Sequence, residues 1–88
     1  MKIKEGYLLR NVANNYIVVA VGEAGIDFNG IITINETGAM LWELLAGGAS
    51  KDELVSKLTE EYDVSKEIAE ADVDAFLNIM KEADLLEN

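Results

Sequence analysis

Short apolar runs dominate the first third of the chain. Residues 7–12, 16–21 and 30–34 contain many β-branched and aromatic side chains, which favour β-strands. Turn-forming residues separate the runs, with two asparagines in residues 13–15 and two glycines in residues 22–25. Because successive strands with short links usually lie side by side, we predict a three-stranded antiparallel meander.

The second run, residues 16–21, is apolar at every position and therefore on both alternating faces. A strand with two apolar faces is normally covered on both sides. One layer of helices covers a single face of such a small sheet, so the other face needs a second cover. The N-terminal segment, the loop around Phe28 and a second subunit are the three alternatives.

A helical pattern begins directly after the third strand. Apolar residues recur at helical spacing over residues 36–46, and two glycines at 47–48 end the pattern. The Asn35 side chain can accept a hydrogen bond from a free backbone N–H of the first turn, and Glu36 places a negative charge at the positive end of the helix dipole. The strand is therefore expected to run into the helix with almost no loop.

Trp42 lies off the main apolar stripe of this helix. The helix therefore has apolar contacts to make on more than one side. Our leading interpretation is that Trp42 anchors the helix to the sheet in the core. The alternative is an exposed aromatic side chain that binds a ligand.

Two further helices are predicted in the second half of the chain. Ser50 and Glu53 have the spacing of a capping box, which predicts a helix of about three turns that ends before Asp63. Ser65 can cap a third helix over about residues 66–83. The predicted fold is α+β and winged-helix-like, with a three-stranded antiparallel sheet followed by three helices.

The third helix carries more apolar surface than a single core contact requires. At about 100° per residue its apolar positions, which include Phe76, Leu77 and Ile79, span roughly 180°, whereas a one-sided surface helix needs about 100°. Asp72 projects into this arc between Ile79 and Phe76. Two interpretations stay open: a rim position favoured by the helix dipole, or a carboxylate at the border of a groove that binds a cation on a ligand.

Composition excludes several classes of function. The 88 residues, expected to form one domain over residues 1–88, have a net charge of −10 and a pI of about 4.2. This acidity disfavours nucleic-acid binding, because phosphate must be met by cations. Histidine and cysteine are absent and no glycine-rich phosphate loop is present, so we expect neither catalysis nor a cofactor or metal site. No apolar run approaches the roughly 20 residues of a membrane helix, and the first residues lack the apolar core of a signal peptide, so we expect a cytoplasmic protein.

The third strand would form one edge of the meander. Residues 31–34 carry no charge and no proline that would block pairing with another chain. An open edge of this kind can bind an extended peptide as an additional strand, with main-chain hydrogen bonds supplying affinity. The alternative is that the strand is covered and belongs only to the core.

Several short motifs follow one another in order along the chain. They are Asp27-Phe28-Asn29-Gly30, the third strand with Asn35-Glu36-Thr37-Gly38, the helix around Trp42, Gly47-Gly48, Tyr62-Asp63-Val64, and Asp72-Val73 with Phe76-Leu77. This order resembles the PqqD-like family, small domains also called RiPP recognition elements. The resemblance covers nearly the whole chain and contains no catalytic signature.

The resemblance implies a non-catalytic role in peptide modification. A member of this family binds the leader segment of a ribosomal precursor peptide as an extra strand, between the third strand and the third helix, and presents it to a modifying enzyme. That enzyme is often a radical iron–sulfur enzyme, which would hold the cofactor. The peptide-binding residues that the resemblance implies are Ile31, Ile32, Thr33, Ile34, Asp72, Ala75, Phe76 and Ile79.

Two other functions stay open. The two-faced second strand and the open third edge also suit a dimerising or structural domain, including a homodimer. A winged-helix transcription regulator has the same elements. Its recognition helix would carry Lys66 and Lys81 against six carboxylates between Glu67 and Asp84, so phosphate would repel it.

Overall fold

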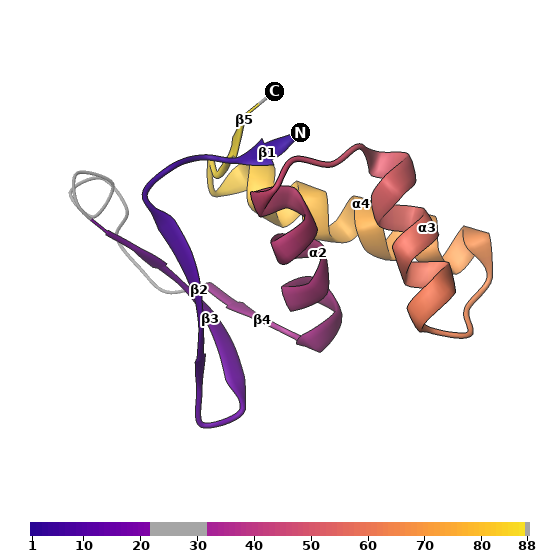
Figure 1. The fold of residues 1–88 in the computed structure, drawn as a ribbon, viewed down its shortest axis with the longest axis horizontal. Coiled ribbons are helices and arrows are strands. Elements are labelled where there is room, and N and C mark those ends of the chain that lie inside the picture. Colours follow the sequence, from indigo (N-terminus) through magenta and orange to yellow (C-terminus); the bar gives the residue numbers. More distant parts are fainter. Residues whose placement is uncertain (22–31, 88) are drawn as a thin grey trace.

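The computed structural model describes residues 1–21 and 32–87 and shows the predicted α+β architecture, with the helices to one side of the sheet (Figure 1). The elements in chain order are β1 (Lys2–Ile3), β2 (Tyr7–Val12), β3 (Asn15–Ala20), β4 (Ile32–Ile34), α2 (Glu36–Ala46), α3 (Lys51–Glu61), α4 (Lys66–Glu82) and β5 (Leu86–Glu87).

Strands β2, β3 and β4 form one antiparallel sheet in that order, which confirms the predicted meander. Ala13 and Asn14 join β2 to β3, and both have positive φ angles, 51° and 69°. Two consecutive positive φ angles are typical of the type I′ turn, whose twist matches that of a hairpin. Asn15, expected in the turn, is instead the first residue of β3. The predicted third strand is observed at 32–34, and its residues 30 and 31 lie outside the described residues.

All three helices begin at the predicted caps. The Asn35 side chain accepts a hydrogen bond of 2.8 Å from the Gly38 N–H, which begins α2 one residue after β4 ends. Ser50 and Glu53 form the reciprocal capping box of α3. The Ser65 hydroxyl accepts from the backbone of α4. Each side chain satisfies an N–H that has no partner within its helix.

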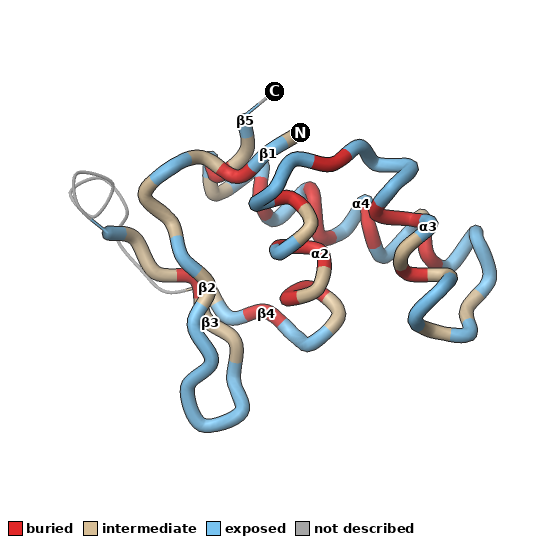
Figure 2. The backbone as a smooth tube through the Cα atoms, viewed as in Figure 1, coloured by how far each residue is buried: buried red, intermediate tan, exposed pale blue. Residues whose placement is uncertain are grey.

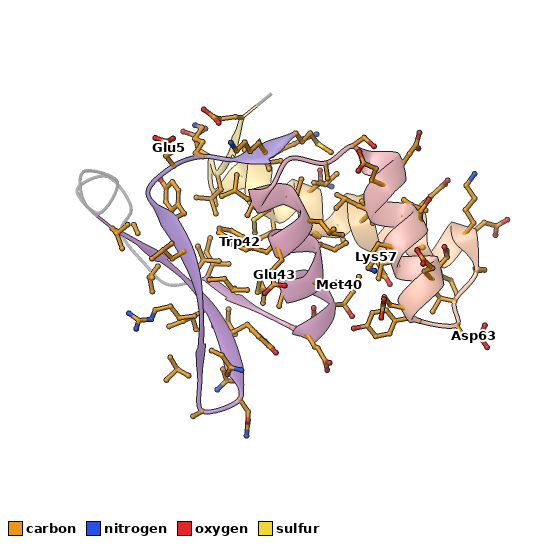
Figure 3. All side chains as sticks on the ribbon, in the orientation of Figure 1. Glu5, Met40, Trp42, Glu43, Lys57 and Asp63 are labelled. Atoms are coloured by element: carbon orange, nitrogen blue, oxygen red, sulfur yellow. The ribbon has the colours of Figure 1, made fainter. Side chains whose placement is uncertain are left out.

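The core lies between the inner face of the sheet and the three helices. Its largest fully buried side chains are Leu41, Leu45, Leu54, Leu58, Met80, Leu85, Val18 and Val73. Trp42 is 4% exposed and packs in this core, so the interpretation as a core anchor is confirmed and the exposed-aromatic alternative is wrong. Figure 3 shows Trp42 and Met40 on opposite sides of α2, with Met40 towards α3.

A second, two-stranded sheet was not predicted. Strands β1 and β5 pair antiparallel, with Ile3 opposite Leu86, and bring the two ends of the chain together (Figure 1). The Lys4 N–H donates to the Leu85 carbonyl at 2.8 Å, and the Lys4 ammonium lies 2.7 Å from an Asp84 carboxylate oxygen. The N-terminal segment therefore packs against the end of α4.

The two faces of the main sheet differ in burial. Val18 of β3 is fully buried on the inner face, whereas Ile17 and Val19 on the outer face are only half-buried. Leu8 and Val12 of β2, also on the outer face, are 51% and 53% exposed. Figure 2 shows the turn end of the β2–β3 hairpin as exposed. Within the described residues the outer face of the second strand is therefore only partly covered. Of the three expected covers, the N-terminal segment pairs with β5 instead, the loop around Phe28 lies outside the described residues, and a second subunit stays a prediction.

Candidate functional site

A groove lies where β4, the first turns of α2 and the middle of α4 meet. Its volume is about 290 Å³. It is lined by Thr33, Ile34, Asn35, Thr37, Gly38, Leu41, Asp72, Ala75, Phe76 and Ile79. One side of the groove is the end of an edge strand, and the opposite side is a helix.

The direct connection from strand to helix forms the β4 side of the groove. Ile34 pairs with Tyr16 of β3 and is buried. Asn35 then caps α2, so the chain turns within one residue and places Gly38 and Leu41 behind the strand. Because Gly38 has no side chain, the groove stays open where the start of α2 lies beside Phe76 of α4.

The α4 side of the groove combines buried and exposed apolar groups. Phe76 is 6% exposed and belongs to the core, while Ile79 is 48% exposed. Ala75 is exposed on the same face of α4, and its small side chain leaves space in the groove. Leu77, which belongs to the apolar arc predicted for this helix, is buried and does not line the groove. A ligand in the groove would therefore cover Ile79 and the accessible part of Phe76.

The groove brings together six of the eight residues that the sequence singled out, namely Thr33, Ile34, Asp72, Ala75, Phe76 and Ile79. Ile32 belongs to β4 but does not line the groove, and Ile31 lies outside the described residues. Sequence reasoning missed Asn35, Thr37, Gly38 and Leu41 as lining residues. The sequence did contain a signal for these residues. No loop separates the strand from the helix, so the first turns of α2 must lie beside the strand.

Among the described residues that line the groove, Asp72 is the only charged one. The four ion pairs of the described residues involve other carboxylates, and two of these, Glu70 and Asp74, flank Asp72 on α4. Asp74 points towards α3, where its carboxylate lies 2.7 Å from the Lys51 ammonium and raises the pKa of that lysine through a hydrogen bond. Within the part of the chain that the structure describes, Asp72 thus has no cationic partner.

The register of the sheet determines which backbone groups of β4 face outward. A two-residue hairpin loop makes the flanking pair, Val12 and Asn15, a hydrogen-bonded pair, and such pairs alternate along the strands. The bond of 2.8 Å from the Val21 N–H to the Gly6 carbonyl agrees with this alternation.

By the same alternation, Tyr16 and Val18 direct their backbone groups to β4 rather than to β2. Their partners Ile34 and Ile32 are therefore the hydrogen-bonded residues of β4. Thr33, between them, directs both its N–H and its C=O to the free side of β4. In the described sheet β4 has a neighbour on one side only, β3, so this pair of groups is available to another strand.

The described residues that line the groove offer hydroxyl, amide and carboxylate groups, and the chain contains no histidine or cysteine. Within residues 1–21 and 32–87 no cluster of three or more His, Cys, Asp or Glu side chains could hold a metal ion. The helices that the structure describes are also too short or too polar to cross a membrane.

Comparison with protein families matches residues 15–86 to the family model described as coenzyme PQQ synthesis protein D (PqqD). No curated protein sequence matches the chain at a significant level.

Two solved structures are similar over the whole domain. One is described as TbiB1 in complex with the TbiA(beta) leader peptide; it is 23% identical, with a TM-score of 0.78, and the match covers 100% of this chain and 96% of that one. The other, described as lasso peptide synthetase B1 complexed with the leader peptide, is 21% identical, with a TM-score of 0.78 and coverage of 99% and 96%. At this level of identity the likeness establishes a shared fold.

Proposed function

The chain belongs to the PqqD family, and from this premise we propose that residues 1–88 form one domain that binds the leader segment of a precursor peptide and presents it to a modifying enzyme. Binding adds the leader as a fourth strand at the free side of β4. The two similar structures, both described as complexes with a leader peptide, support this proposal.

The observation that carries the proposal is the outward-facing backbone of Thr33 beside an apolar groove. Strand addition uses main-chain hydrogen bonds for affinity and side-chain pockets for specificity. Thr33 offers one donor and one acceptor, and the groove lies directly next to it. The proposed contact residues are Ile31, Ile32, Thr33, Ile34, Asp72, Ala75, Phe76 and Ile79, with Asn35, Gly38 and Leu41 added by the geometry of the groove.

The domain itself acts as a binding partner and not as a catalyst in this proposal. The modifying enzyme carries any cofactor, and a radical iron–sulfur enzyme is the class that the family resemblance implies. We place both proteins in the cytoplasm, where ribosomal peptides are made.

A homodimer is the second candidate. The exposed side chains of Leu8 and Val12 on the outer face of the sheet support it, because solvent-exposed apolar clusters favour association. Light scattering coupled to size-exclusion chromatography, over a range of protein concentrations, distinguishes it from a monomer that binds peptide.

The proposed function is tested by nuclear magnetic resonance titration of the ¹⁵N-labelled chain. The probes are synthetic peptides that cover the N-terminal halves of short open reading frames encoded beside this gene, each with a scrambled control. We expect saturable shifts at Thr33, Ile34 and residues 72–79, and slower exchange of the Thr33 amide hydrogen when it becomes bonded. Shifts confined to α3 or to the β1–β5 sheet, or no binding at high micromolar peptide, would contradict the proposal.

A further inference from the structure

We propose that Asp72 makes the groove selective for a bound segment that carries a lysine or arginine at a fixed distance from a pair of apolar residues; this inference rests on the proposed function and specifies its ligand. The argument combines the register of β4 with the charge of the groove.

The register determines which side chains of a bound strand enter the groove. Thr33 and Ile17 are cross-strand partners, and their side chains lie on the outer face of the sheet, opposite to the buried Val18 and Ile34. A residue that pairs with Thr33 shares that outer face, because paired residues of neighbouring strands point the same way. The residues immediately before and after it must then point to the inner side, into the groove.

The groove surface that meets these two side chains is mainly apolar. Phe76, Ala75 and Ile79 form the α4 side, with Leu41 behind them. Burying a branched apolar side chain there removes the exposed surface of Ile79 from water. The bound segment is therefore expected to carry apolar residues on both sides of the residue that pairs with Thr33.

Asp72 adds a charge requirement at one end of the groove. It lies seven residues before Ile79, which at 1.5 Å per residue is about 10 Å along α4, or about three residues of an extended strand. A lysine or arginine within about three residues of the apolar pair can therefore reach the carboxylate.

The helix dipole does not explain an acidic residue at this position. The dipole acts mainly within the first turn of a helix, and in α4 that turn contains Glu67, whereas Asp72 is the seventh helical residue. Its two acidic neighbours on α4 already have lysine partners, which leaves Asp72 as the carboxylate available to a ligand in the described part of the site. In a chain with a net charge of −10, a basic peptide is also attracted from a distance.

The experiment is selection of random 12-residue peptides by display against the whole 88-residue chain and its variants. For the wild type we expect enriched peptides with two apolar residues separated by one position, and a lysine or arginine at a constant offset from them. Asp72→Asn should lose the basic preference, and Asp72→Lys should select aspartate or glutamate at the same offset. Glu67→Gln, which removes the same charge from the far side of α4, should select the same peptides as the wild type.

The same peptides give a quantitative measure. Replacing the selected lysine by norleucine should weaken binding to the wild type roughly threefold to tenfold by fluorescence anisotropy, and should not weaken binding to Asp72→Asn. Enrichment of the apolar pair without a basic residue, or a basic preference that persists in Asp72→Asn, would overturn this inference and leave the proposed function intact. No enriched peptide, or enrichment that survives Thr33→Pro in a folded chain, would overturn the proposed function itself.

Discussion

Gly38 lies beside Phe76, so that a Cβ atom at Gly38 would be in ordinary van der Waals contact, at 3.5 Å, with Cδ1 of the phenylalanine ring. The same atom would lie 3.2 Å from the Cβ of Ile34 and 3.2 Å from Oδ1 of Asn35. Neither neighbour moves freely, because Ile34 is buried in the sheet and Asn35 Oδ1 holds the cap of α2. Glycine at this helical position therefore keeps β4, α2 and α4 in contact around the groove.

The first prediction concerns Gly38→Ala. Alanine in a helix is favoured over glycine by about 1 kcal/mol, but crowding a packed site costs about 1–3 kcal/mol. We expect the free energy of unfolding to fall by about 1 kcal/mol, and peptide affinity to fall because the methyl group enters the groove. Urea unfolding followed by circular dichroism measures the first effect.

Gly47→Ala is the matched control for this substitution. Gly47 ends the same helix, has a φ of −89° that alanine adopts easily, and a Cβ there would meet only the Leu44 carbonyl oxygen at 3.8 Å. Gly47→Ala should leave the free energy of unfolding unchanged or slightly increased. If Gly38→Ala stabilised the chain as much as Gly47→Ala, the close approach of Gly38 to Ile34 and Asn35 would be wrong.

The second prediction is a pH dependence that arises between α3 and α4. The hydrogen bond to Asp74 raises the pKa of Lys51 above its ordinary value of 10.5. A raised lysine pKa in the folded state adds stability that is complete below the unfolded pKa and is lost as the pH rises through the folded pKa. The stability difference between wild type and Lys51→Met should therefore shrink as the pH is raised from 9 to 12.

Urea unfolding midpoints at several pH values measure this difference. Lys2→Met is the control, because Lys2 makes no ion pair within the described residues, and its difference from wild type should not follow the same course. A constant difference for Lys51→Met across this pH range would show that the ion pair with Asp74 does not persist in solution.

The sequence predicted those features that depend on neighbours in the chain. Helix caps at Asn35, Ser50 and Ser65 need only three or four consecutive residues, and all three are observed. The position of the groove was also predictable, because a strand that continues into a helix without a loop leaves few ways to arrange the third helix. The individual residues came from the family resemblance, and six of those eight line the groove.

The features that were missed depend on contacts between distant residues. Strands β1 and β5 are two residues each and join the beginning of the chain to its end, so no local pattern indicates their pairing. The burial of Leu77 is a second feature that the sequence could not predict. The width of an apolar arc shows that a helix has several contacts, but not which contact each residue makes.

The third prediction tests the importance of the β1–β5 pair. Ile3 is 6% exposed and belongs to the core, so Ile3→Ala should lower the free energy of unfolding by about 2–4 kcal/mol. For a folded chain of 88 residues this is a large share of the total stability. Leu8→Ala removes an apolar side chain of the same size from the exposed outer face of β2 and should cost well under half as much. Equal losses in urea unfolding would mean that β1 is not docked.

The fourth prediction concerns the backbone N–H groups of β4, which point alternately to β3 and to the free side of the strand. Thr33→Pro deletes the outward N–H while both hydrogen-bonded pairs with β3 remain, so it should abolish peptide binding at a small cost in stability. Thr33→Val keeps the N–H and should still bind, which separates the backbone donor from the side-chain hydroxyl. Isothermal titration calorimetry with a peptide that binds the wild type measures both variants.

Ile32→Pro provides the opposite case on the same strand. The N–H of Ile32 faces β3, so proline there removes a hydrogen bond of the sheet and should lower the free energy of unfolding by more than Thr33→Pro does. Because the backbone groups of successive residues alternate in direction, the two prolines must have different effects if the register is correct. A Thr33→Pro chain that is less stable than Ile32→Pro, or that binds the peptide as tightly as wild type, would show that the free side of β4 is not where the leader pairs.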